Sequence, residues 1–164
     1  MDQSVHILGQ GVLSAQALID ANVNPETGLA TDYLNHFNEV VMLLEMLGDM
    51  PDMAEDVLAW VPLGYEEHFH KSGHAGADIV VAAYGAVPRE LKAHFQTLVH
   101  ALDTALGQAQ DAVRQCEFAQ ASQIAASDIE PLLAAARAAV NGRIEGDGVD
   151  DQSADQAEVD ALFG

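Results

Sequence analysis

An acid and an amide one helical turn apart can act together, and the sequence places such a pair at Asp111 and Gln115. Side chains four residues apart project from the same face of a helix, so one surface can offer a charged anchor and an amide that positions a water molecule. The alternative is a solvated helix face, on which Asp111 pairs with Arg114 and Gln115 contacts water. We take Asp111 and Gln115 as the first candidate pair.

A second group of acids and amides lies at the start of another predicted helix, near residue 32. Asp32, Asn35 and Glu39 fall on one helical stripe, with His36 and Asn38 beside them, so this surface can also present an acid and an amide. The alternative is a capped helix start, where Asp32 favours the positive end of the helix dipole and the amides are solvated. This group is the reserve candidate site.

Three histidines close together suggest a metal site. They are His68, His70 and His74, and a bundle of carboxylates and histidines would suit zinc or a di-iron centre. The spacing argues against such a site, because His68 does not share a helix face with the other two and Gly73 interrupts the helix. The prediction is therefore that the protein has no metal or cofactor of its own.

Composition limits the classes of partner. Against 26 acidic residues stand six basic ones, which gives a net charge of −20 and a pI near 4.2, so nucleic acid and anionic membrane surfaces would be repelled. The single cysteine, Cys116, excludes an intramolecular disulfide. No long apolar segment or secretion signal is evident, and we expect a cytoplasmic protein.

The elements that must position these residues are helices. Apolar residues recur at helical spacing, and Ala and Leu are abundant while period-two alternation is lacking, so we predict an all-α fold. The expected arrangement is an antiparallel helical bundle with a long helical hairpin, spanning residues 1–143. Four methionines are expected in the core: Met42, Met46, Met50 and Met53. The helices are predicted over residues 5–21, 33–47, 52–60, 63–72, 77–87, 89–118 and 127–140, the last with Ser127 as its N-cap.

The end of the chain has a different composition. Residues 144–164 contain seven acids and no base, and we predict a flexible acidic linker over residues 144–154. Residues 155–164 regain a helical pattern with Val159, Leu162 and Phe163 on one side. A helix this short is only marginally stable alone in water. Its apolar face is therefore expected to bind a partner.

This terminal segment resembles the peptide by which bacterial chemotaxis proteins bind the phosphorylated response regulator CheY. It is similar to the start of the flagellar switch protein FliM and to the end of the CheZ phosphatases, where it also follows a linker. The resemblance implies that the regulator binds Glu158, Val159, Asp160, Ala161, Leu162 and Phe163.

CheZ-like phosphatases also carry an acid and an amide in a D-x-x-x-Q pattern on a long helical hairpin, which the first candidate pair resembles. The resemblance implies that Gln115 orients the water that attacks the regulator's aspartyl phosphate, and that Asp111 pairs with a lysine of the regulator. The divalent metal, Mg²⁺ by expectation, belongs to the regulator. The surroundings depart from the family, since Ala109-Gln110 and Val113-Arg114 stand where it has Phe-Gln and Thr-Gly.

The function predicted is hydrolysis of the aspartyl phosphate of a CheY-type response regulator, by a chain that can form a homodimer. Two alternatives stay open. One is a binding module without catalysis, in which the tail captures the regulator and the bundle anchors to a flagellar or receptor complex. The other is a metal-binding helical bundle.

Overall fold

The computed structural model describes residues 7–73 and 76–143, and every regular element in them is helical. No strand occurs in these residues, so the predicted all-α class is confirmed. The elements are η1 (Gly11–Leu13), α1 (Ala15–Asp20), η2 (Thr31–Leu34), α2 (Asn35–Met46), α3 (Met53–Ala59), α4 (Tyr65–Lys71), α5 (Ala77–Gly85), α6 (Arg89–Arg114), α7 (Phe118–Ile124), the π-helical turn η3 (Ala125–Ile129) and α8 (Glu130–Val140).

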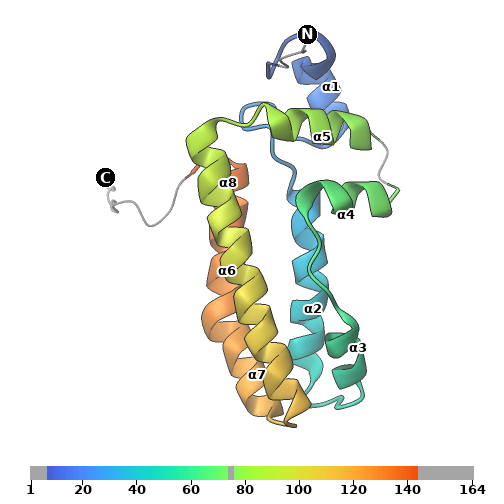
Figure 1. Cartoon of the computed structure of the whole chain (residues 1–164), viewed down its shortest axis with the longest axis vertical. Coiled ribbons are helices and arrows are strands. Elements are labelled where there is room, and N and C mark those ends of the chain that lie inside the picture. Colours follow the sequence, from blue (N-terminus) through green and yellow to red (C-terminus); the bar gives the residue numbers. More distant parts are fainter. Residues whose placement is uncertain (1–6, 74–75, 144–164) are drawn as a thin grey trace.

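The largest feature is a long helical hairpin. Helix α6 runs down one side, and α7, η3 and α8 return beside it in the opposite direction (Figure 1). Apolar residues of α6 recur at spacings of three and four and are buried against the returning arm, which removes one stripe of α6 from water. The buried residues of α6 are Leu91, Phe95, Leu98, Leu102, Ala105, Leu106, Ala109, Ala112 and Val113.

A third rod, α2, lies along the hairpin and runs in the same direction as α6 (Figure 1). Its buried residues, Phe37, Val40, Val41 and Leu44, follow the helical period that predicted it. Helix α3 lies beside the end of α2 and contacts α6, whereas α4 and α5 cover the other end of the rods. Helices α3, α4 and α5 therefore lie against the two ends of the rods.

The hairpin departs from prediction at its turn. Helix α6 ends at Arg114 rather than near residue 118, because Cys116 adopts a left-handed backbone conformation with φ of 61°. The N–H of Cys116 donates to the carbonyl of Val113, and that of Glu117 donates to the carbonyl of Ala112. This is a Schellman motif, which glycine usually supplies.

Two further predictions are wrong: the N-cap at Ser127 and the burial of three of the four methionines. Ser127 is no N-cap, because residues 118–140 form one continuous helical run with a π-helical turn, and its hydroxyl accepts a hydrogen bond from Gln123. Met42, Met46 and Met50 are exposed rather than in the core. They lie on the outer face of α2 and just beyond it, where no described element covers them.

No helix in the described ranges combines the length and apolar character needed to cross a membrane.

Candidate functional site

The first candidate pair lies at the turn of the hairpin. Asp111 is in the last turn of α6 and its side chain is 69% exposed. Arg114 Nη1 donates to Asp111 Oδ1 over 2.6 Å, which is the pairing that the alternative interpretation of this helix face named. An exposed ion pair of this kind contributes about 0–1 kcal/mol, so a partner can displace Arg114 at little cost.

Gln115 is the first residue beyond α6, yet it keeps its helical relation to Asp111. Its backbone N–H donates to the carbonyls of Asp111 and Ala112, both over 3.2 Å. The acid and the amide therefore remain one turn apart, as the spacing predicts. Both residues are exposed, so they form an accessible surface at one end of the molecule.

Gln110, next to this pair, has a structural role that the sequence did not indicate. Its Nε2 donates to the carbonyls of Val57 and Trp60 over 2.9 and 2.8 Å. These bonds satisfy the last carbonyls of α3 and attach that helix to α6. The hairpin turn is thus held against α3, on the side away from the exposed pair.

The reserve site is more dispersed than its sequence spacing suggests. Asp32 lies in η2, half-buried, and its Oδ2 accepts a hydrogen bond from Asn22 Nδ2 over 3.0 Å. Asn35 and Glu39 are exposed one turn apart at the start of α2. Asn38, beside them, accepts a weak bond from Arg137 of α8 at 3.4 Å. Asn35 and Glu39 are therefore accessible, whereas Asp32 is hydrogen-bonded to Asn22 of the preceding loop.

The histidines serve different parts of the fold. His36 stacks on Trp60 with ring centroids 4.7 Å apart, and its Nε2 bonds to the carbonyl of Val61 over 2.7 Å. His68 contacts the ring of Tyr33, and His70 is exposed on α4. Within residues 7–73 and 76–143 no three acids, histidines or cysteines are grouped as metal ligands would be, and His74 lies outside these ranges.

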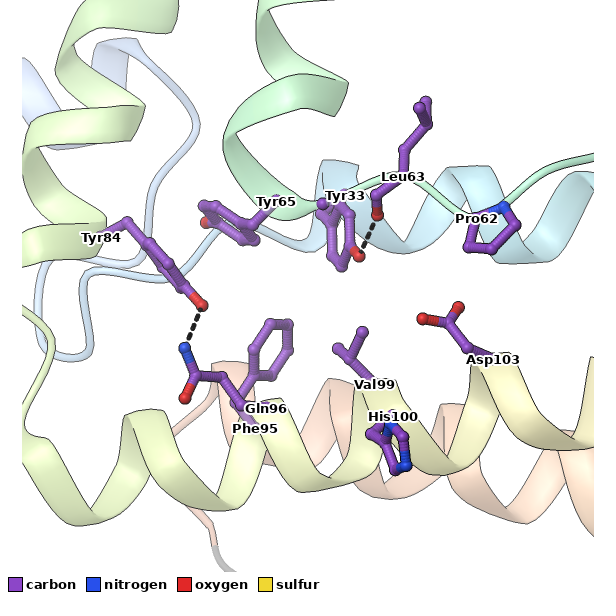
Figure 2. Close-up of a pocket in the computed structure, with 11 residues that line it drawn as sticks. Tyr33, Pro62, Leu63, Tyr65, Tyr84, Phe95, Gln96, Val99, His100 and Asp103 are labelled. Atoms are coloured by element: carbon purple, nitrogen blue, oxygen red, sulfur yellow. Dashed lines mark hydrogen bonds between the residues drawn. The ribbon is translucent and has the colours of Figure 1, made fainter.

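A cavity that the sequence did not predict lies between α6, η2 and α4. Aromatic rings line it together with Asp103 of α6 (Figure 2). Burial raises the pKa of Asp103, while the nearby His100 and His36 lower it by a smaller amount. No motif signalled this cavity, because its walls come from distant parts of the chain.

The predicted linker and the predicted regulator-binding residues, Glu158 to Phe163, lie outside the described residues. No protein-family model, curated protein or solved structure matches this chain.

Proposed function

We propose that this protein is a phosphatase for the aspartyl phosphate of a CheY-type response regulator, acting in the cytoplasm. The observation that carries the proposal is the accessibility of Asp111 and Gln115, which remain one helical turn apart at the turn of a long hairpin. The acidic-apolar sequence of residues 155–164, which resembles a regulator-binding peptide, supports the same partner.

In the proposed reaction the regulator brings both the phosphoryl group and its Mg²⁺. Gln115 holds a water molecule in line with the bond to be broken, by accepting one of its protons in a hydrogen bond through Oε1. The water oxygen attacks phosphorus, the bond from phosphorus to the regulator's aspartate breaks, and inorganic phosphate and a free carboxylate result. Gln115 is unchanged by the reaction, because it positions the water and forms no covalent bond.

Asp111 has a positioning role in this scheme. It exchanges its bond with Arg114 for one with a lysine ammonium of the regulator, which fixes the amide over the phosphoryl group. The exchange is between two exposed cations, so its net cost is small. Arg114, once released, remains available to the acidic surface of the regulator.

The test is the decay of a phosphorylated CheY-type regulator, labelled with ³²P, with and without the protein. Gln115→Ala is expected to lower the saturated rate about 100-fold while regulator binding stays nearly unchanged, because the amide acts on the attacking water. Asp111→Ala should weaken both rate and binding. Gln108→Ala, an exposed glutamine on the same helix, is the matched control and should retain the parental rate.

Asn35→Ala tests the reserve site. If this variant abolishes decay while Gln115→Ala does not, the chemistry belongs to the start of α2 and the assignment to the hairpin turn is wrong. A regulator that binds but decays at its own rate contradicts the phosphatase proposal. That result favours the binding module, a candidate supported by the existing bond between Asp111 and Arg114.

The proposal includes a homodimer, as the resemblance implies. Light scattering on the intact chain checks it, and a mass of 17.4 kDa would show that the chain is a monomer.

A further inference from the structure

The cavity beside α6 has the form of a small-molecule site. Its volume is about 290 Å³. Four aromatic residues are among those that line it: Tyr33 from η2, Tyr65 from α4, Tyr84 from α5 and Phe95 from α6. Figure 2 shows these rings on one side of the space, with Asp103 facing it from α6 at the other end. Apolar walls with a few convergent polar groups are typical of ligand sites.

The rings hold one another in place. Tyr65 stacks on Tyr84 with centroids 4.2 Å apart, and Tyr33 lies 5.0 Å from Tyr65. The tyrosine hydroxyls are also fixed, since Tyr33 donates to the carbonyl of Leu63 over 2.7 Å and Tyr65 accepts from the backbone N–H of Ala30 over 2.8 Å. The aromatic wall is therefore formed before any ligand binds, which reduces the entropic cost of binding.

The acid in this cavity lacks a partner for one of its oxygens. Asp103 Oδ1 is shielded from solvent, and no donor among the described residues bonds to it. A buried acceptor left unpaired destabilises the fold, and a charged one does so more strongly. The carboxylate points into the space between α6 and the segment at Pro62 (Figure 2). Because the carboxylate group lines the cavity, a cationic ligand there can pair with it.

The chemistry of the walls selects the ligand. The faces of aromatic rings attract cations, and Lys92 already uses this property, with its Nζ 4.4 Å from the centre of the Tyr84 ring. An anion would be repelled by Asp103 and by a chain whose net charge is −20. A neutral apolar molecule would leave the carboxylate of Asp103 without a counter-charge. A cation with an apolar body satisfies both the carboxylate and the rings.

We propose that this cavity binds a small organic ammonium ion, with its charged nitrogen against the carboxylate of Asp103 and its apolar body along the cavity wall that includes Tyr84 and Val99. The ammonium pairs with the carboxylate of Asp103, which lines the cavity, and its charge is also attracted by the ring faces. This site is separate from Asp111 and Gln115, and the inference holds whether or not the protein is a phosphatase.

Calorimetric titration with matched probes tests the proposal. 2-Phenylethylammonium is the cation, 2-phenylethanol its neutral counterpart and 3-phenylpropanoate the anion. The cation is expected to bind at least about 10-fold more tightly than the alcohol, and the anion not at all. Equal affinity for cation and alcohol, or no binding of the cation at millimolar concentration, would overturn the proposal.

Two variants connect the binding to Asp103. Asp103→Asn keeps the shape of the side chain and is expected to lose the preference for the cation, with affinity for 2-phenylethanol retained. Asp128→Asn removes an exposed acid from η3, outside the cavity, and controls for the change in net charge. Thermal unfolding of Asp103→Asn shows whether the variant is folded. Parental affinity of folded Asp103→Asn for the cation would contradict the assignment.

Discussion

Asp103 lies in an environment that disfavours a charged carboxylate. Its carboxylate is half-buried with an unpaired oxygen, and burial raises its pKa from the ordinary value of 3.8. As pH rises above that value, the unfolded chain loses this proton before the folded chain does. The folded state then binds more protons, so the free energy of unfolding falls as pH increases through the window between 3.8 and the raised value.

Replacing Asp103 by Asn is therefore expected to stabilise the protein at pH 7. Because water still reaches half of the side chain and screens its charge, we expect a gain of no more than about 1 kcal/mol in the free energy of unfolding, or roughly 2–4 °C in Tm. The gain should shrink as pH falls toward 3.5, because the unfolded state, with a pKa of 3.8, becomes increasingly protonated as well. Urea unfolding of the parent and Asp103→Asn from pH 3.5 to 7 measures this difference.

The two histidines near Asp103 oppose the rise in its pKa but do not reverse it. His100 on the same helix and His36 on α2 lower its pKa, but by less than burial raises it. Tyr33, which faces the same cavity, has its own pKa raised by burial and by Asp103. A destabilised Asp103→Asn variant at pH 7 would show that the carboxylate makes a stabilising contact, contrary to its unpaired state here.

At the scale of elements, the turn between α6 and α7 carries a local strain. Cys116 has a φ of 61°, a conformation that costs about 1 kcal/mol or more for a residue with a Cβ. Cys116→Gly is expected to increase the free energy of unfolding by about 1 kcal/mol, because glycine adopts this conformation without that cost. Chemical denaturation of the two proteins under reducing conditions provides the measurement.

The neighbouring residue provides the control for that turn. Glu117 has a φ of −95°, so Glu117→Gly gains nothing from the freedom of glycine and should lose about 0.5–1 kcal/mol through the entropy of the unfolded chain. If both substitutions stabilised the protein, the positive φ of Cys116 would not explain the effect of Cys116→Gly. The same pair also tests whether the spacing of Asp111 and Gln115 depends on this turn, through the phosphatase rate.

At the scale of the whole molecule, the charge is divided unevenly between the helical part and the tail. Residues 144–164 carry seven acids and no base, which leaves residues 1–143 with 19 acids against six bases. We propose that the hairpin catalyses hydrolysis and that residues 155–164 increase the affinity for the regulator. A tethered anchor raises the effective concentration of the regulator without changing the chemical step.

Replacing Leu162 and Phe163 together by alanine is therefore expected to raise the regulator concentration that gives half the maximal rate, by about 10-fold or more. The rate at saturation should stay close to the parental value. Rates measured over a range of regulator concentrations separate the two effects. The double variant of Gln152 and Ser153, both to alanine, alters the predicted linker and should change neither quantity; a fall in the saturated rate of the Leu162 and Phe163 variant would contradict this proposal.

The sequence by itself determined the all-α class and most helix positions, because burial of one helix face imposes a local period of 3.6 residues that can be counted along the chain. It also predicted that Asp111 and Gln115 share a face, which depends only on residues four apart. The end of α6 was missed, because Cys116 fills a position where glycine is the usual signal.

Only the tertiary structure decided which surfaces remain open. Met42 and Met46 follow the helical pattern of α2, yet they are exposed because no described element packs on that face. The cavity joins Tyr33, Tyr84 and Asp103, which are far apart in the sequence. Neither the enclosure of this space nor the unpaired oxygen of Asp103 can be counted along the chain, because both depend on how separate helices pack against one another.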